Sequence, residues 1–132
     1  MIIAGYTVEN PHHMMADIDK VMAVIDTEDK WAWGRYAFDA DGIPSNPNFD
    51  RACCWCLFGA IRKAFNFDYD QFASAPVSQY LELVLWNRFP EWYSRPLSVF
   101  NDNAAIEYKH VIALLQYARD LVAYEVAVAE AA

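Results

Sequence analysis

The sequence predicts a small, mainly α-helical domain of about four helices around a buried central helix, with a minor extended or hairpin arm. Three observations lead to this fold class. Apolar residues recur at helical spacing in four separate segments. Asn, Asp and Pro residues stand where these segments begin or end. More than half of the 132 residues are apolar, which is enough for one core, so we expect residues 1–132 to form a single domain.

The central helix is expected over Asp50–Phe65. Asp50 suits its N-cap, and Arg62 and Lys63 suit its C-terminal end, where the helix dipole favours cations. Asn66 is well suited to end it in a left-handed turn. Its main apolar stripe consists of Cys53, Cys56, Leu57, Ala60, Ile61 and Ala64. Because much of the opposite side is apolar as well, this helix belongs inside the protein.

Gly59 interrupts this helix with a residue of low helix propensity. Glycine has no Cβ, so it allows another segment to lie against the helix backbone. We therefore expect a close crossing at Gly59.

Three further helices follow from local signals. Asn10-Pro11 begins a first helix that ends near Thr27. Pro76 begins another helix that continues to about Arg88. Its inward residues are expected to be Val77, Tyr80, Leu81, Val84 and Leu85, and its outward residues Ser78, Gln79 and Glu82. Pro90 stops that helix. Asn101, Asp102 and Asn103 supply cap residues for a last helix with its stripe on Val111, Leu114, Leu115, Ala118, Leu121 and Val122, fraying after Tyr124.

The remaining segments are expected to be irregular. Residues 28–49 read as an aromatic-rich arm with a short hairpin around Asp41-Gly42. Residues 66–73 read as an acidic aromatic loop, and residues 91–100 as a connector.

The composition indicates a protein-binding role. A formal net charge of −8 argues against a nucleic-acid surface, which needs basic residues, and favours a basic protein partner. Five Trp, eight Tyr and eight Phe exceed what a small core normally holds, so part of this aromatic surface is expected at an interface. Aromatic residues adjoin acidic ones at the candidate partner-binding residues Tyr36, Phe38, Asp39, Asp41, Asp68, Tyr69, Asp70, Glu91 and Trp92. The alternative is that these rings fold back onto the core.

No motif for catalysis or for a cofactor stands out. A phosphate loop, a nucleophile elbow and a paired zinc-ligand signature are all absent from the sequence, so we expect no metal and no cofactor. The rival interpretation is a thiol- or metal-dependent enzyme that uses Cys53 or Cys56 with His110. A third is a self-associating structural protein, in which a homodimer would cover the surplus aromatic side chains.

The three cysteines also bear on the compartment. An odd count within one segment does not make a disulfide framework, so a reducing cytosol is the natural setting. We find no apolar run of membrane-spanning length and no N-terminal signal pattern, which predicts a cytoplasmic protein without membrane contact.

Several short motifs resemble those of a family of small uncharacterised proteins from bacterial and phage genomes. They are Trp33-Gly34-Arg35, Asp39-Ala40-Asp41-Gly42, Cys56-Leu57-Phe58-Gly59-Ala60-Ile61, Phe100-Asn101-Asp102 and Val111-Ile112-Ala113-Leu114-Leu115. The family pattern lacks the residue at Phe58 and has Trp in place of Phe100. The resemblance spans roughly residues 31–118 and carries no assigned reaction.

The resemblance implies that Cys56, Gly59, Asn101 and Asp102 are framework positions where the central helix meets the loop before the last helix. It also points to a phage or mobile-element origin. Together with the acidic charge, this leads us to expect a non-enzymatic inhibitor of a host defence nuclease of the CRISPR type. Such an inhibitor would occlude a basic nucleic-acid or partner site on a nucleic-acid-handling effector.

Overall fold

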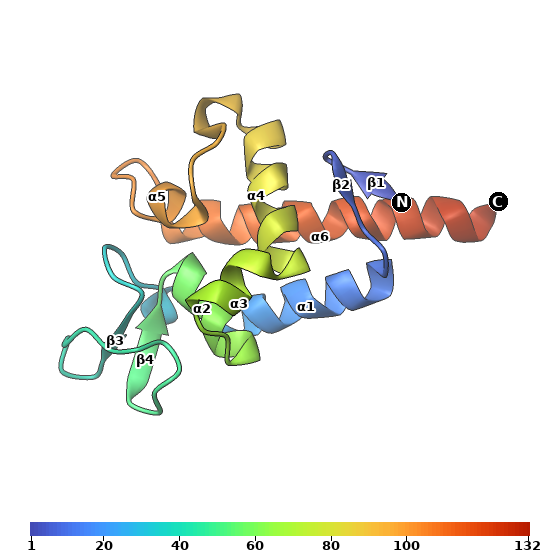
Figure 1. Cartoon of the computed structure of the whole chain (residues 1–132). Coiled ribbons are helices and arrows are strands. Elements are labelled where there is room, and N and C mark those ends of the chain that lie inside the picture. Colours follow the sequence, from blue (N-terminus) through green and yellow to red (C-terminus); the bar gives the residue numbers. More distant parts are fainter.

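The computed structural model describes all 132 residues and confirms the mainly α fold class (Figure 1). It contains six α-helices and two two-stranded antiparallel sheets, rather than about four helices. The elements in order are β1 (Ile2–Ile3), β2 (Tyr6–Thr7), α1 (Pro11–Val24), η1 (Glu28–Lys30), β3 (Ala37–Asp39), β4 (Ala52–Trp55), α2 (Leu57–Phe65), α3 (Tyr69–Ser74), α4 (Pro76–Arg88), η2 (Pro90–Trp92), α5 (Leu97–Asn101) and α6 (Tyr108–Ala131), where η marks a 3₁₀ helix.

The core lies between four helices. The long helix α6 runs along the helical body, α1 packs along it, α2 packs against α1, and α4 packs against both α1 and α6 (Figure 1). Their fully buried side chains include Ile18, Val21, Leu57, Ile61, Leu81, Leu85 and Leu115. Tyr80 of α4 donates a hydrogen bond of 2.7 Å from its hydroxyl to the carbonyl oxygen of Ala118 in α6, so its one polar atom is satisfied inside this core.

Helix α1 begins as its sequence predicts. Asn10 Oδ1 accepts a hydrogen bond of 3.0 Å from His13 N, and Pro11 occupies the first helical position. The apolar stripe at Met14, Ile18, Val21 and Ile25 is buried. The helix ends at Val24, slightly before the expected end near Thr27.

The expected helix over Asp50–Phe65 is wrong in its first part. Residues Ala52–Trp55 form strand β4, which pairs antiparallel with β3. Helix α2 begins only at Leu57, and its N-cap is Cys56 rather than Asp50, with Cys56 Sγ accepting a hydrogen bond of 3.3 Å from Gly59 N. An apolar run of this kind suits a strand as well as a helix, and the backbone partners offered by β3 decide between them.

The second half of that segment matches the prediction. Leu57 to Ile61 are all buried, so α2 is a central helix. Asn66 ends it in the left-handed conformation, with φ of 55°. Arg62 and Lys63 lie in its last turn.

Helix α3 lies where a loop was expected. Asp68 and Gln71 form a capping box, in which Asp68 Oδ1 accepts from Gln71 N at 2.8 Å and Gln71 Oε1 accepts from Asp68 N at 2.9 Å. Phe72 anchors this short helix in the core. The spacing of Asp68 and Gln71 is that of a capping box, so the start of this helix has a local cause in the sequence.

Helix α4 has the predicted bounds, and Pro90 follows its end as the first residue of η2. Ser78, however, was expected to point outward and is buried. The connector at residues 91–100 is also more ordered than expected, because Leu97–Asn101 form α5.

The last helix starts later than expected. Asn101 belongs to α5, and α6 begins at Tyr108, where Glu107 forms a capping box with His110. His110 Nδ1 accepts a hydrogen bond of 2.9 Å from Glu107 N. The predicted stripe is buried except for the half-buried Leu121, and the helix continues to Ala131 with Val126 buried, so the expected fraying after Tyr124 is wrong.

The β3–β4 arm projects from the helical body (Figure 1). Its turn at Asp41-Gly42 is present: Asp39 Oδ1 accepts hydrogen bonds from Asp41 N and Ile43 N, and Gly42 has φ of 75°. None of the helices combines the length and the apolar character that crossing a membrane requires.

Candidate protein-binding surface

Asn101 joins three segments beneath the candidate surface. Its Oδ1 accepts hydrogen bonds from Trp31 Nε1 at 2.7 Å and from Leu57 N at 3.1 Å. Its Nδ2 donates to Ala32 O at 3.1 Å and to Asp102 Oδ1 at 2.9 Å. The side chain is fully buried, and its two donors and two acceptor positions are all occupied. Asn101 therefore fixes the segment around Trp31 against the start of α2.

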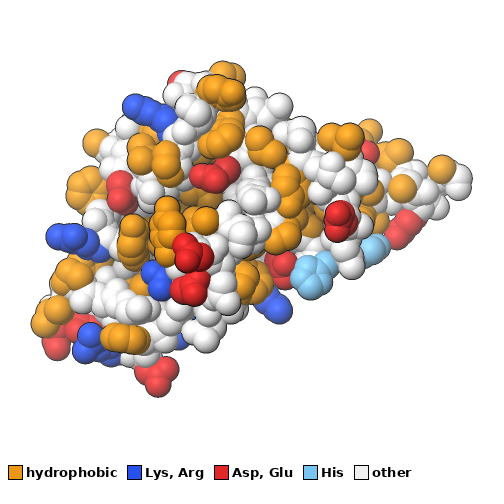
Figure 2. All heavy atoms as spheres, viewed as in Figure 1, with side chains coloured by type: hydrophobic (Ala, Val, Ile, Leu, Met, Phe, Trp, Pro, Cys, Tyr) orange, Lys and Arg blue, Asp and Glu red, His pale blue; other side chains and the backbone are white.

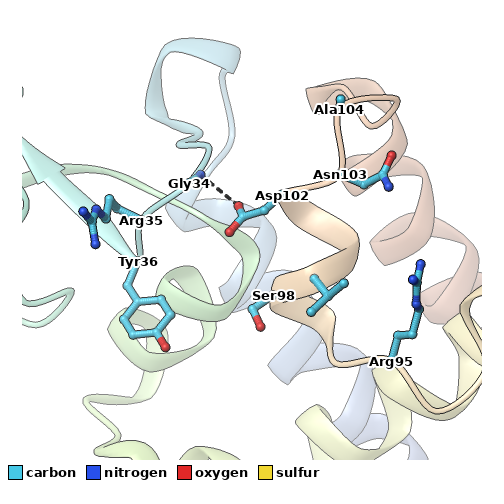
Figure 3. Close-up of a pocket in the computed structure, with 9 residues that line it drawn as sticks. Gly34, Arg35, Tyr36, Arg95, Ser98, Asp102, Asn103 and Ala104 are labelled. Carbon is cyan, nitrogen blue, oxygen red and sulfur yellow. Dashed lines mark hydrogen bonds between the residues drawn. The ribbon is translucent and has the colours of Figure 1, made fainter.

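Asp102 extends this network to the loop before β3. Its Oδ1 also accepts a hydrogen bond of 2.9 Å from Gly34 N (Figure 3). Gly34 has φ of 86°, a conformation that favours glycine. The loop that carries Arg35 and Tyr36 is thus held at the C-terminal end of α5.

Gly59 is the position where this loop crosses α2. A Cβ on Gly59 would overlap the carbonyl oxygen of Tyr36 and lie 2.9 Å from the carbonyl carbon. The same oxygen accepts a hydrogen bond of 3.2 Å from Cys56 N. The close approach predicted at Gly59 is therefore present, and its partner is the backbone of Tyr36.

Four aromatic rings lie in contact above this crossing, and we call them the aromatic strip: Tyr36, Phe58, Tyr69 and Phe72. Phe58 is at the centre, with ring centroids 4.4 Å from Tyr36, 6.0 Å from Tyr69 and 4.1 Å from Phe72. Phe58 and Phe72 are buried, whereas Tyr36 and Tyr69 are 47% and 62% exposed. The strip therefore presents two tyrosines to solvent on a buried aromatic base.

Charged groups border the strip. Asp68 and Asp70 are exposed on either side of Tyr69, and neither forms an ion pair. The guanidinium of Arg62 lies 6.0 Å from the centre of the Phe58 ring, and Arg62 Nε donates to Phe67 O at 3.0 Å. Over the region of α2 and α3, acidic, basic and hydrophobic side chains lie next to one another (Figure 2).

A pocket of about 700 Å³ opens on the other side of Tyr36. Its lining residues are Gly34, Arg35, Tyr36, Arg95, Ser98, Val99, Asp102, Asn103 and Ala104. Arg35 and Arg95 lie on opposite sides of it, with Tyr36 and Ser98 between them (Figure 3). Because Tyr36 belongs both to the pocket and to the aromatic strip, the two features form one continuous surface.

The other predicted partner-binding residues neither line the pocket nor belong to the aromatic strip. Phe38 and Asp39 are half-buried in the β3–β4 arm, and Asp41 is exposed at its turn. Glu91 is exposed on η2. Trp92 was expected to be exposed, but its ring is buried edge-on against Phe100 at 5.4 Å between centroids.

The cysteines do not share one helix. Cys53 is exposed and Cys54 half-buried on β4, and burial raises the pKa of the Cys54 thiol. Cys56 is buried at the start of α2, where desolvation raises the pKa of its thiol to about 12. Its sulfur acts as a helix cap, which is not the electropositive, accessible setting of a nucleophilic thiolate.

His110 is engaged in the capping box of α6, and no group of three His, Cys, Asp or Glu side chains is placed to hold a metal ion.

Comparison with known proteins places this chain in a family. A family model described as a family of unknown function, DUF6197, matches residues 10–121. The chain belongs to this family. The comparisons with curated proteins and with solved structures gave no match. The match to DUF6197 runs from the N-cap of α1 to the later turns of α6, so it includes the aromatic strip and the pocket.

Among the residues of this surface in the DUF6197 chain that the sequence did not predict are Phe58, Arg35 and Arg95. Phe58 looked like one of several apolar residues on a buried helix, and only the packing of α3 reveals that it joins Tyr36 to Tyr69. The two arginines are 60 positions apart, and no local pattern links them.

Proposed function

We propose that this DUF6197 protein is a non-enzymatic binding module that engages another protein through the aromatic strip and the adjoining pocket. The observation that carries the proposal is the packing of Tyr36 and Tyr69 against Phe58, which leaves two large rings partly exposed on a fixed base. Exposed tyrosines on a packed base are typical of interface anchors.

Rigidity supports this role. The backbone of Tyr36 is held by its bond from Cys56 N and by its contact with Gly59, and the loop is tied to Asp102 through Gly34 N. Tyr69 follows directly after the capping residue of α3. A surface already held in place loses little conformational freedom when a partner binds, which favours affinity.

Inhibition of a host defence nuclease of the CRISPR type is the narrower form of this proposal. The observations that favour it are the net charge of −8, the small size of the chain and the resemblance to phage and bacterial proteins. The partner would be a basic, nucleic-acid-handling effector, and the module would act in the cytoplasm by occupying one of its sites, without a cofactor.

The test compares matched tyrosines. The tagged protein and its Tyr36→Ser/Tyr69→Ser variant are used to capture proteins from a nuclease-treated host lysate over a salt series, and any captured protein is purified and its affinity measured. Tyr124→Ser is the control, because Tyr124 is 67% exposed on α6 and lies outside the strip. We expect the Tyr124 variant to bind like the parent and the double variant to lose roughly tenfold or more in affinity.

Equal affinity of the parent and the Tyr36/Tyr69 variant for the purified partner would overturn the proposal. Light scattering of the parent addresses the self-associating alternative. A stable dimer that dissociates in the Tyr36→Ser/Tyr69→Ser variant would show that the strip binds a second copy of the chain instead. Inhibition of a purified nuclease by the parent, and not by the double variant, would establish the narrower form.

A further inference from the structure

We propose that the surface formed by the aromatic strip and the pocket is electrically bipolar and binds a partner segment whose charges follow the opposite order. Such a segment carries cationic residues at the Tyr69 end, an apolar or aromatic residue over Phe58, and an acidic residue at the pocket. This inference rests on the proposed function and specifies the chemistry of the partner at that same surface.

The Tyr69 end is acidic. Asp68 and Asp70 are both exposed beside the Tyr69 ring, and no cation pairs with either carboxylate. One oxygen of Asp68 caps Gln71 N, whereas the side chain of Asp70 makes no hydrogen bond within the chain. This end therefore offers two negative groups to a Lys or Arg of the partner.

The pocket end is basic, against the sign of the whole chain. Arg35 and Arg95 are exposed, and neither pairs with an acidic side chain although the protein has 18 Asp and Glu residues. The guanidinium of Arg95 lies over the Trp92 ring at 5.2 Å from its centre. This contact orients the group without neutralising its charge.

The backbone of Arg95 is fixed as well. Arg95 N donates to Trp92 O at 3.0 Å, and Arg95 O accepts from Trp86 Nε1 at 2.8 Å. The carboxylate of Asp102 in the same pocket already accepts bonds from Gly34 N and Asn101 Nδ2. No ion pair joins Asp102 to Arg35 or Arg95, so both guanidinium groups remain available to an incoming carboxylate.

The middle of the surface is the apolar ring of Phe58 with the guanidinium group of Arg62 over it. Arg62 covers part of the Phe58 ring, with its Nε engaged by Phe67 O. The order along the surface is thus two carboxylates, an aromatic base with one half-buried guanidinium, and two guanidinium groups. The net charge of −8 attracts a basic partner at long range. The local order of charges then determines the orientation in which the partner segment docks.

Short fluorescein-labelled peptides test the inference by fluorescence polarisation. One peptide has two lysines, a Trp-Leu centre and two glutamates in that order, and a second peptide of equal composition alternates the lysines and glutamates around the same centre. We expect the first peptide to bind roughly tenfold more tightly than the second.

Charge variants identify the two ends. Arg35→Glu/Arg95→Glu removes the basic end, and Asp68→Asn/Asp70→Lys removes the acidic end while Asn keeps the helix cap. Each should reduce the preference for the ordered peptide to about equal binding of the two peptides. The matched controls are Arg88→Glu and Glu125→Lys, both exposed and outside this surface, and these variants should retain the preference.

Thermal unfolding followed by circular dichroism verifies that each variant is folded. Binding of both peptides with equal affinity by the parent, lost in Tyr36→Ser/Tyr69→Ser, would overturn the bipolar order while leaving the proposed function standing. Binding that is unaffected by the tyrosine substitutions would contradict the proposed function itself. No binding of the ordered peptide would overturn the bipolar inference.

Discussion

Asn101 Oδ1 accepts a hydrogen bond of 3.1 Å from Leu57 N, across 44 positions of the chain. Leu57 is the first residue of α2, and an amide at this position has no partner within its own helix. Asn101 therefore caps α2 from a distant segment while the same oxygen holds Trp31. The network that fixes the loop of Tyr36 and the one that starts the central helix thus share one buried side chain.

Replacing Asn101 with Leu should destabilise the protein by about 3 kcal/mol or more, because Trp31 Nε1, Leu57 N and Ala32 O lose their partners and each unsatisfied buried group costs about 1–3 kcal/mol. Urea unfolding provides the measurement. Asn87→Leu is the control, since Asn87 is exposed on α4, and it should stay within about 0.5 kcal/mol. Similar losses for the two variants would argue against the network.

Asn101→Asp is a sharper variant of the same test. The new carboxyl would be buried beside the carboxylate of Asp102, and both burial and the like charge disfavour its ionised form. Its folded-state pKa would lie above its unfolded value, so its stability relative to the parent should fall as pH rises between these two values. A pH-independent difference in unfolding free energy would contradict this account.

Gly59→Ala should destabilise the protein by about 1–3 kcal/mol or more, because the added Cβ would overlap the carbonyl oxygen of Tyr36. Since that atom belongs to backbone held by Cys56 N, it has little room to move. Lys63→Ala, in the same helix, is the control and should change stability by less than about 0.5 kcal/mol. An unchanged melting temperature for Gly59→Ala would exclude the close crossing.

The parts of the fold that the sequence predicts well have their causes nearby in the chain. Asn10-Pro11 at the start of α1 and the two prolines that bracket α4 act locally, and both helices have nearly the predicted bounds. Strand β4 was not predicted, because the apolar Cys-rich run suits a helix as well as a strand. The strand forms because β3 supplies its backbone hydrogen-bond partners. The start of α6 was misplaced because Asn101 has cap chemistry but uses it on α2.

The candidate surface was predictable in its parts and not in its assembly. An aromatic residue beside acidic ones marked Tyr36 and Tyr69, which the structure brings together through Phe58. The same pattern marked Trp92, whose ring turns inward because η2 packs it against Phe100. A local pattern identifies candidate anchors, whereas tertiary packing decides which of them reach solvent.

Glu82 provides a pH-dependent prediction. Burial within α4 raises the pKa of its carboxyl, with a smaller opposing effect from the backbone amide of Leu97. The folded-state pKa of Glu82 exceeds its unfolded-state pKa, so at a pH between these two values the native state binds more protons than the unfolded state. The free energy of unfolding therefore falls as pH rises from the lower value to the higher one. Glu82→Gln should therefore be more stable than the parent at neutral pH.

The measurement is urea unfolding of Glu82→Gln and the parent across a pH series. The difference in unfolding free energy should vanish below the unfolded-state pKa of a glutamate and grow above it. Glu125→Gln, exposed on α6, is the control and should show no such trend. A Glu82→Gln variant that is less stable than the parent at neutral pH would mean that the ionised carboxylate is stabilising.

The three thiols should react in a fixed order with a disulfide reagent at mildly alkaline pH. Cys53 is exposed and should react first, Cys54 is half-buried with a raised pKa and should react more slowly, and Cys56, buried with a pKa of about 12, should react only on unfolding. Cys53→Ser should abolish the fast phase and leave the others unchanged. The sulfur of Cys56 caps α2 through Gly59 N, so a reagent should reach it only when the start of the helix opens. Rapid labelling of Cys56 in the native state would contradict this burial and would favour a thiol-dependent enzyme.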